Sequence, residues 1–382
     1  MNLVIHDLDT AAWEALRRDY EGWRVVSDRG TIRPCTGCFC CWNKTPGQCV
    51  LKDGYEHMGA LLHEAEEVHV ISRYTYGGFS GFVKNVFDRC LGYVLPQFGV
   101  VGGETHHRKR YAEDKPFTFI FYGGGLREEE KASARRYAEA VCANIRGRVK
   151  EVRFPERGER PAEAASRLPE AGAGKLLLIN ASMRSENGNS AKLARKLCAR
   201  LAEEPEIAAL KEYREKPDEL LRRMEEASAV VLCMPLYVDG LPSQLIRFLE
   251  TAEREFRGGA KRTYVLANMG LYESGQLVNL FEAVRQWCGR MGFSYCGGLG
   301  VSAGELVGVL MEHLPFAHGP TKRIAAGMDA LAAAIDAGAA AGEIYAGLRA
   351  FPRSLYILIA NMNWNRTARK NGLRPKELYR RL

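Results

Sequence analysis

A pattern of strand, turn and helix occurs twice in the chain, and it limits the possible folds more than any other feature. VHVISRYTYGGFSGFVKNVFD (residues 68–88) resembles AVVLCMPLYVDGLPSQLIRFLE (residues 229–250), and Tyr76 aligns with Tyr237. Further along, FYGGGLREE resembles ANMGLYES. An internal repeat of this kind predicts two copies of one unit. Because strands alternate with helices in each copy, we predict an α/β chain with two doubly wound parallel-sheet domains in tandem.

The length and local composition suggest where these domains begin and end. The chain has 382 residues, enough for two domains. We expect a first domain over residues 1–150 and a charged, alanine-rich linker with several prolines over 151–174. A second domain is expected over 175–302, and residues 303–382 are predicted to form a helical C-terminal extension, a candidate arm for closing a dimer interface.

Composition excludes several classes of protein. Hydrophobic residues make up 46% and charged residues 26% of the chain, as in globular proteins that do not cross membranes. No apolar run is long enough to span a bilayer, and the N-terminus lacks the pattern of a signal peptide. We therefore expect a cytoplasmic protein with no membrane partner. The net charge of +8 suits anionic small molecules and does not require nucleic acid.

A polar loop in the second half has the composition of an anion site. An apolar run at residues 176–179 ends in small and polar residues, and a helical pattern begins near Ser190. Helix N-termini bind anions through backbone N–H groups and the helix dipole. The loop lacks both the P-loop and the dinucleotide fingerprint, so a phosphate monoester fits better than a nucleoside triphosphate. An ordinary N-capped turn between strand and helix remains the alternative.

Together these segments resemble the NADPH-dependent FMN reductases and iron–sulfur flavoproteins of the flavodoxin-like superfamily. In that family three loops lie at the carboxyl ends of successive parallel strands, where such sheets bind ligands. The first loop holds the FMN phosphate and the other two frame the isoalloxazine. By resemblance the cofactor-binding residues are Ser182, Arg184, Asn187, Gly188, Asn189, Ser190, Pro235, Leu236, Tyr237, Val238, Asp239, Gly240, Asn268, Met269, Gly270, Tyr272 and Glu273. Helix capping by Glu273 is the simpler interpretation of that residue.

The first half departs from the family pattern after its first strand. The family places a phosphate loop of Gly, Ser and Asn there, whereas this chain has His6-Asp7-Leu8-Asp9-Thr10. Two carboxylates without a glycine would repel a phosphate. We therefore expect one FMN per chain, on the second domain, with a degenerate first domain covering it. Weak flavin binding by the first domain is the alternative.

Five cysteines occur within fifteen residues of the first half, which points to metal or thiol chemistry. Cys35, Cys38, Cys41 and Cys49 have the C-x2-C-x2-C-x7-C spacing, and the resemblance to iron–sulfur flavoproteins suggests that they ligate a [4Fe–4S] cluster. Soft thiolates also suit zinc. Buried or redox-active cysteines without metal are the third interpretation.

The resemblance implies an FMN-dependent oxidoreductase that takes electrons from NAD(P)H or from the cluster and passes them to a quinone, an aromatic or another small acceptor. No catalytic side chain is assigned, because the flavin carries the chemistry. The basic run at residues 106–110 could attract the 2′-phosphate of NADPH, although such runs are usually solvated surface. The alternative function is an electron carrier or redox sensor that exchanges electrons with protein partners such as a ferredoxin-like donor. A homodimer is one possible assembly, in which each chain already contains two similar domains packed as a pseudo-dimer.

Overall fold

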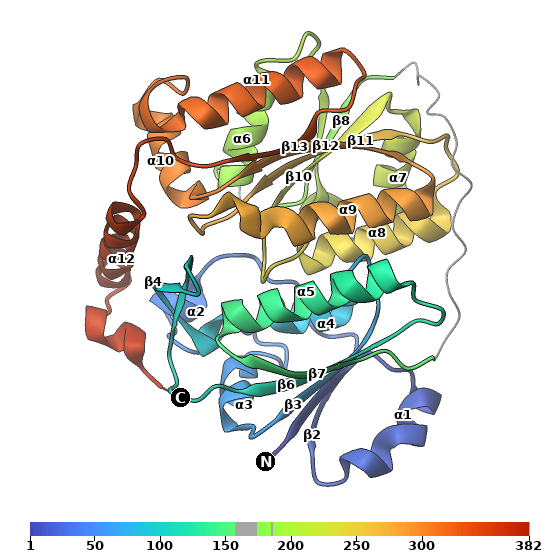
Figure 1. The fold of residues 1–382 in the computed structure, drawn as a ribbon, viewed down its shortest axis with the longest axis vertical. Coiled ribbons are helices and arrows are strands. Elements are labelled where there is room, and N and C mark those ends of the chain that lie inside the picture. The colour runs from blue at the N-terminus through green and yellow to red at the C-terminus, as the bar shows by residue number, and fades with distance from the viewer. Residues whose placement is uncertain (157–173, 185, 382) are drawn as a thin grey trace. The chain divides into compact units, whose positions relative to one another are not determined.

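The computed structural model describes residues 1–156, 174–184 and 186–381 (Figure 1). Its contacts divide the chain into two compact units. The first comprises Met1–Arg160 and Ile357–Leu382, and the second comprises Pro161–Tyr356. Residues 157–173, which contain most of the expected linker, and Ser185 of the expected phosphate loop lie outside the described residues.

The first unit is built on a five-stranded parallel sheet in the order β2-β1-β3-β6-β7. A separate antiparallel hairpin, β4–β5, is inserted before β6. The elements in chain order are β1 (Leu3–His6), α1 (Thr10–Leu16), η1 (Arg17–Tyr20), β2 (Arg24–Ser27), α2 (Cys40–Asn43), α3 (Met58–Glu64), β3 (Val68–Arg73), α4 (Gly81–Asp88), η2 (Leu91–Tyr93), β4 (Val94–Val101), β5 (Glu104–Lys109), β6 (Pro116–Tyr122), α5 (Glu128–Ile145) and β7 (Arg148–Arg153).

The second unit is built on a six-stranded parallel sheet in the order β13-β12-β11-β10-β8-β9. Its elements are β8 (Leu177–Asn180), α6 (Asn189–Cys198), β9 (Glu206–Ala209), η3 (Leu210–Tyr213), α7 (Pro217–Glu226), β10 (Ala229–Pro235), α8 (Ser243–Glu255), β11 (Arg262–Asn268), η4 (Ser274–Leu277), α9 (Val278–Met291), β12 (Ser294–Val301), α10 (Gly304–His313), η5 (Gly319–Thr321), α11 (Lys322–Asp336) and β13 (Gly342–Ala346). The final elements of the chain are α12 (Arg353–Lys370) and η6 (Pro375–Tyr379).

Helices cover both faces of each sheet. In the second unit α6 and α11 lie on one face, and α8 and α9 lie on the other (Figure 1). In the first unit α1 covers one face, while α4 and α5 cover the opposite face (Figure 1). A parallel strand covered on both faces is apolar throughout. The run Ala229–Met234 shows this, because all six of its side chains are buried.

The two sheets have the same strand order over five strands. Numbered within each unit, both read 2-1-3-4-5, which is the flavodoxin-like order of a doubly wound sheet, and the second unit adds β13 beyond the fifth strand. This confirms the predicted α/β class with parallel sheets. A common topology does not by itself establish a tandem duplication, which stays a proposal.

The C-terminal segment is organised differently from the expected helical extension. Residues 304–356 belong to the second unit and include a strand, β13, that pairs in parallel with β12. Residues 357–382 belong to the first unit. The start of the expected linker is also different, because Glu151–Arg153 form the end of β7. Both strands lie at sheet edges. β7 (RVKEVR) has only two apolar residues and β13 (GEIYA) has only five residues in all, so neither has the long hydrophobic run that marks a central strand.

The basic run lies in and just after β5 of the hairpin, and only part of it is solvated surface, since Arg108 is exposed. His106, His107 and Arg110 are buried. The Arg110 guanidinium donates to the carbonyls of Gly92 and Leu378 at 2.7 Å each. These three side chains are therefore not placed to attract the phosphate of a nicotinamide cofactor. No helix in the described part of the chain is long and apolar enough to cross a membrane.

Candidate functional site

Three of the predicted loops follow neighbouring strands of the second sheet. β8 ends at Asn180, β10 at Pro235 and β11 at Asn268. Because these strands are parallel and adjacent, the loops after them share one edge of the sheet. The structure thus brings together the segments that the sequence predicted to form one site.

The loop after β8 leads into the first turn of α6. Ser182 is buried, and its hydroxyl accepts a hydrogen bond from the Arg184 N–H at 3.3 Å. Asn187 is exposed and Gly188 is the N-cap residue of α6. A glycine has no side chain that could accept hydrogen bonds from the first turn, so these N–H groups suit an external anion.

The Arg184 side chain has a protein partner. Its guanidinium forms an ion pair with Glu305, at the start of α10, with an N–O distance of 2.9 Å. The positive charge that the sequence assigns to a phosphate is therefore partly neutralised here. Asn189 also faces α10, because a Cβ atom on Gly308 would lie 2.1 Å from its Oδ1 atom. α10 thus borders the loop, which the sequence did not indicate.

The loop after β10 is a tight turn in a strained conformation. Tyr237 and Gly240 exchange backbone hydrogen bonds of 3.1 and 3.0 Å. The two residues between them, Val238 and Asp239, have φ angles of 37° and 57°. Side chains other than glycine seldom adopt such angles, and such outliers cluster at binding sites. Leu236, just before the turn, donates its N–H to the carbonyl of Asn268 at 2.7 Å.

Asn268 connects the three loops. Its buried side-chain amide donates to the Ser190 hydroxyl at 2.6 Å and to the Met234 carbonyl at 3.3 Å. Ser190 lies in the first turn of α6 and Met234 lies near the end of β10. We infer that Asn268 positions the loops, a role that the sequence did not distinguish from direct contact with the cofactor.

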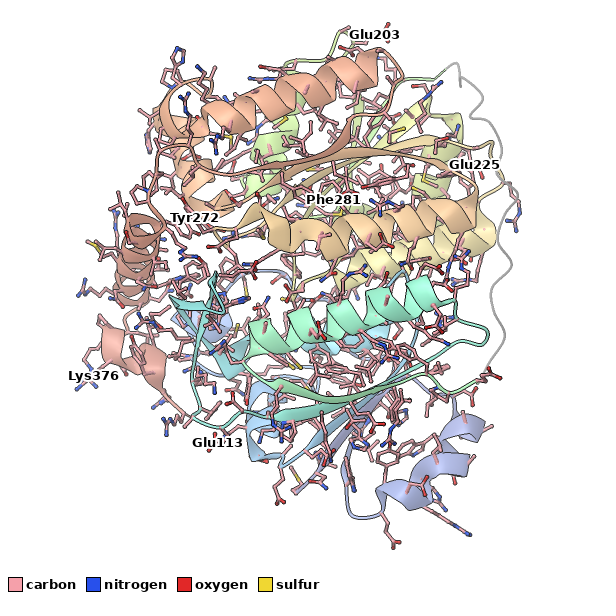
Figure 2. All side chains as sticks on the ribbon, viewed as in Figure 1. Glu113, Glu203, Glu225, Tyr272, Phe281 and Lys376 are labelled. Atoms are coloured by element: carbon pink, nitrogen blue, oxygen red, sulfur yellow. The ribbon has the colours of Figure 1, made fainter. Side chains whose placement is uncertain are left out.

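The rest of the third loop is held by the first turn of α12 and by Phe351 just before it. The hydroxyl of Tyr272, labelled in Figure 2, donates to the Phe351 carbonyl at 2.5 Å, and that of Tyr356 donates to Gly270. The Glu273 carboxylate forms an ion pair of 3.0 Å with Arg353. Glu273 is the N-cap residue of η4, and its carbonyl accepts from the Gln276 N–H at 3.2 Å, but its side chain makes no cap hydrogen bond there. Met269 is buried.

Two buried polar side chains at this edge were missed by the sequence analysis. Gln244, in the first turn of α8, and Ser302, directly after β12, are buried and have no hydrogen-bond partner within the described residues. Buried polar groups are normally hydrogen-bonded. The edge therefore holds donors and acceptors that a polar ligand such as FMN could satisfy, and in this respect its residues fit that cofactor.

The corresponding place in the first unit is occupied by the chain's own carboxylate. Asp7 follows β1, and its carboxylate accepts from the Arg73 N–H at 3.1 Å and from the Tyr122 hydroxyl at 3.0 Å. Burial raises the pKa of Asp7, although hydrogen bonds from Ser80, Arg73 and Tyr122 act in the opposite direction. Backbone and hydroxyl donors that could have faced a phosphate are therefore used internally.

The cysteine segment of the first unit, residues 33–53, is held in place by Arg89. Its guanidinium donates to both carboxylate oxygens of Asp53 at 2.8 and 2.9 Å and to the Arg33 carbonyl at 2.8 Å. The same group donates to the Cys49 sulfur at 3.1 Å. Arg89 therefore joins both ends of the segment and orients its last cysteine.

The cysteines themselves have unlike surroundings. Burial raises the pKa of Cys35 to about 12 and that of Cys41 strongly. Burial would also raise the pKa of Cys38, but hydrogen bonds from the Cys40 backbone and from Thr36 lower it. Within residues 1–156, 174–184 and 186–381, no three His, Cys, Asp or Glu side chains form a group that could hold a metal ion. The expected cluster on Cys35, Cys38, Cys41 and Cys49 is therefore not supported.

The family model that matches the chain covers part of the second unit. Residues 174–305 match the NADPH-dependent FMN reductase family. All three loops lie inside this match, and the sheet of the first unit lies outside it. A solved structure, the Trp repressor binding protein from Bacillus subtilis, is 22% identical and covers 34% of this chain and 84% of its own, with a TM-score of 0.30. No curated protein matches the chain significantly.

Proposed function

We propose that the protein is an FMN-dependent oxidoreductase with one FMN on the second unit and NAD(P)H as its reductant. The observation that carries this proposal is the family match over residues 174–305, which contains the three loops at one edge of the sheet. The buried polar groups of Gln244 and Ser302 at the same edge support it.

Each loop has a distinct role in this proposal. The Ser182 hydroxyl and the first turn of α6 would hold the phosphate, because N–H groups at a helix N-terminus attract anions. The turn at Tyr237–Gly240 would face the ring with its backbone, since its conformation is fixed by two mutual hydrogen bonds. Asn268 would keep both loops in register through Ser190 and Met234.

Bound FMN would supply the redox chemistry, which consists of accepting a hydride and releasing one or two electrons. The side chains described here would bind the cofactor, orient it and exclude water. We propose a quinone, an aromatic or another small molecule as electron acceptor. The rival proposal, an electron carrier or redox sensor, needs a protein partner and no small substrate.

Anaerobic titration with NADPH and NADH tests the function. The FMN-loaded protein is expected to lose its flavin absorbance on mixing, and a quinone should restore that absorbance. The matched variants are Ser182→Ala, at the proposed phosphate loop, and Asp9→Ala, in the equivalent loop of the first unit. Loss of one loop hydrogen bond should weaken FMN binding about tenfold in the first variant only. Reduction by dithionite or a ferredoxin but by neither nicotinamide would favour the electron carrier.

An iron–sulfur or zinc site on the cysteine segment is a separate proposal with less support. The Arg89 guanidinium donates to the Cys49 sulfur at 3.1 Å, which fixes the orientation of this cysteine beside the others of the segment. Quantifying iron, sulfide and zinc in anaerobically purified protein tests this proposal independently of the flavin. Absence of all three from the purified protein would contradict it.

A further inference from the structure

Helix α12 exposes a stripe of large aliphatic side chains. Leu355, Leu358, Ile359 and Met362 lie at spacings of three and four residues, which places them on one face of the helix. Leu358 is 56% exposed and Met362 is 62% exposed. A contiguous apolar surface of this kind marks an interaction site more often than isolated exposed residues do.

The opposite face of α12 is fixed to the fold. Trp364 is buried, and its ring centroid lies 5.3 Å from that of Trp42 and 5.4 Å from that of Phe39. Asn361 accepts from the Phe98 N–H at 2.8 Å and donates to its carbonyl at 3.2 Å. The helix therefore has a defined orientation, and the exposed stripe is the face left without contacts of this kind.

Positive charge continues the same face toward the C-terminus. Arg366, Arg369 and Lys370 are exposed, and helical periodicity places them in line with the apolar stripe. None of the three forms an ion pair with a described residue. Residues 353–382 contain eight Lys and Arg side chains against a single carboxylate side chain, Glu377. Lys376, labelled in Figure 2, projects outward from the segment that follows α12.

We propose that α12 binds the surface of an anionic phospholipid bilayer, lying in the interface without crossing it. Helices with an apolar stripe and many cations bind such surfaces by burying the stripe near the acyl chains and pairing the cations with phosphates. A second copy of the chain fits less well, because two segments with this excess of cations would repel each other. The proposal revises the sequence-based expectation of no membrane partner.

Vesicle co-sedimentation with the full chain tests the proposal. The probes are vesicles of equal parts phosphatidylglycerol and phosphatidylcholine, and vesicles of phosphatidylcholine alone. We expect binding to the anionic vesicles only, and weaker binding at high salt. Replacing Arg366, Arg369 and Lys370 by Gln should weaken binding on the order of 100-fold, given the typical contribution of each cation near an anionic surface.

Two further variants separate the contribution of the apolar stripe from that of net charge. Leu358→Ser with Met362→Ser should also lower binding, since it removes the most exposed part of the stripe. The matched control replaces Arg18, Arg24 and Arg29 by Gln, because these arginines are equally exposed but lie far along the chain from α12. It removes the same net charge and should retain most of the binding. Circular dichroism checks that every variant is folded.

Three results would overturn the proposal. The first is no binding of the wild-type chain to anionic vesicles. The second is an equal loss of binding in the α12 variant and in the arginine control, which would indicate net charge alone. The third is a concentration-dependent dimer in analytical ultracentrifugation that the Leu358 and Met362 substitutions abolish, which would assign the stripe to a second copy.

Discussion

The loop after β1 and the loop after β8 make matching backbone hydrogen bonds, here called the backbone frame, but different side chains lie within it. The Asp7 N–H donates to Ile71 in the first unit, as the Ala181 N–H donates to Cys233 in the second. Likewise Tyr74 donates to Tyr122 and Leu236 donates to Asn268, both at 2.7 Å. The first unit fills this frame with its own carboxylate, whereas the second has Ala181 and Ser182 there. One topology can therefore satisfy these donors internally, as in the first unit, or leave the place open for the external anion that we propose for the second.

The largest effect is expected from the group that anchors the cysteine segment. Arg89→Ala removes one partner of a buried ion pair and leaves the Asp53 carboxylate without its main donor. We expect a loss of about 3–5 kcal/mol in the free energy of unfolding. The equivalent position of the second unit is Thr251, which is only half-buried and, being uncharged, forms no ion pair, so Thr251→Ala should change little. Chemical denaturation measures both, and equal losses would show that the two units are supported alike.

A smaller loss is expected at the residue that joins the second unit's loops. Asn268→Ala removes the donor to Ser190 and Met234 and should cost about 1–3 kcal/mol. It should also release FMN, whereas Tyr122→Phe at the equivalent place in the first unit should leave FMN bound. Fluorescence of released flavin measures the difference. Retention of FMN by Asn268→Ala at full strength would remove this residue from the site.

The pH dependence of stability distinguishes the two frames further. Because the folded-state pKa of Asp7 is raised, the protonated carboxyl stabilises the fold at low pH, and this contribution is lost as pH rises through the folded-state pKa. The stability of the wild type relative to Asp7→Asn should therefore fall with rising pH, by at most about 1.4 kcal/mol per pH unit. Denaturation curves from pH 4 upward measure it. A difference that grows with rising pH would mean that the carboxylate is preferentially ionised.

The smallest effect concerns the first residues of α1 and α6. Asp9 caps α1 by accepting from the Ala12 N–H at 2.8 Å, whereas α6 begins after Gly188. Asp9→Ala should cost about 1 kcal/mol, while Asp9→Gly should cost only a few tenths, because glycine is an accepted N-cap residue. Thermal denaturation compares the two. Equal losses would show that the Asp9 side chain has a role beyond capping.

The central strands and the site-bearing loops could be predicted from the sequence. Apolar runs such as residues 68–71 and 229–234 mark strands buried on both faces, and the polar residues after them mark one sheet edge. The sequence aligned the turn after β3 with the turn after β10 one residue out of register. The mutual hydrogen bonds of Thr75 and Gly78 show that Thr75, not Tyr76, corresponds to Tyr237.

Other features could not be predicted, because they depend on distant partners. β13 and β7 are edge strands without a long apolar run, and pairing with a neighbouring strand defines them. His106, His107 and Arg110 of the basic run are buried because β5 pairs with β4 and because the Leu378 carbonyl accepts from Arg110. The contacts between Arg184 and Glu305, and between Asn189 and Gly308, join residues more than a hundred positions apart.

Counting FMN per chain in a loop-exchange variant tests the central claim most directly. Ala181→Asp places a carboxylate in the second unit at the backbone position that Asp7 occupies in the first, and Ala181→Ser is its uncharged control. The account predicts one FMN per chain in the wild type, close to one in the Ser variant and almost none in the Asp variant, with the fold retained. Two FMN in the wild type, or full retention in the Asp variant, would contradict it.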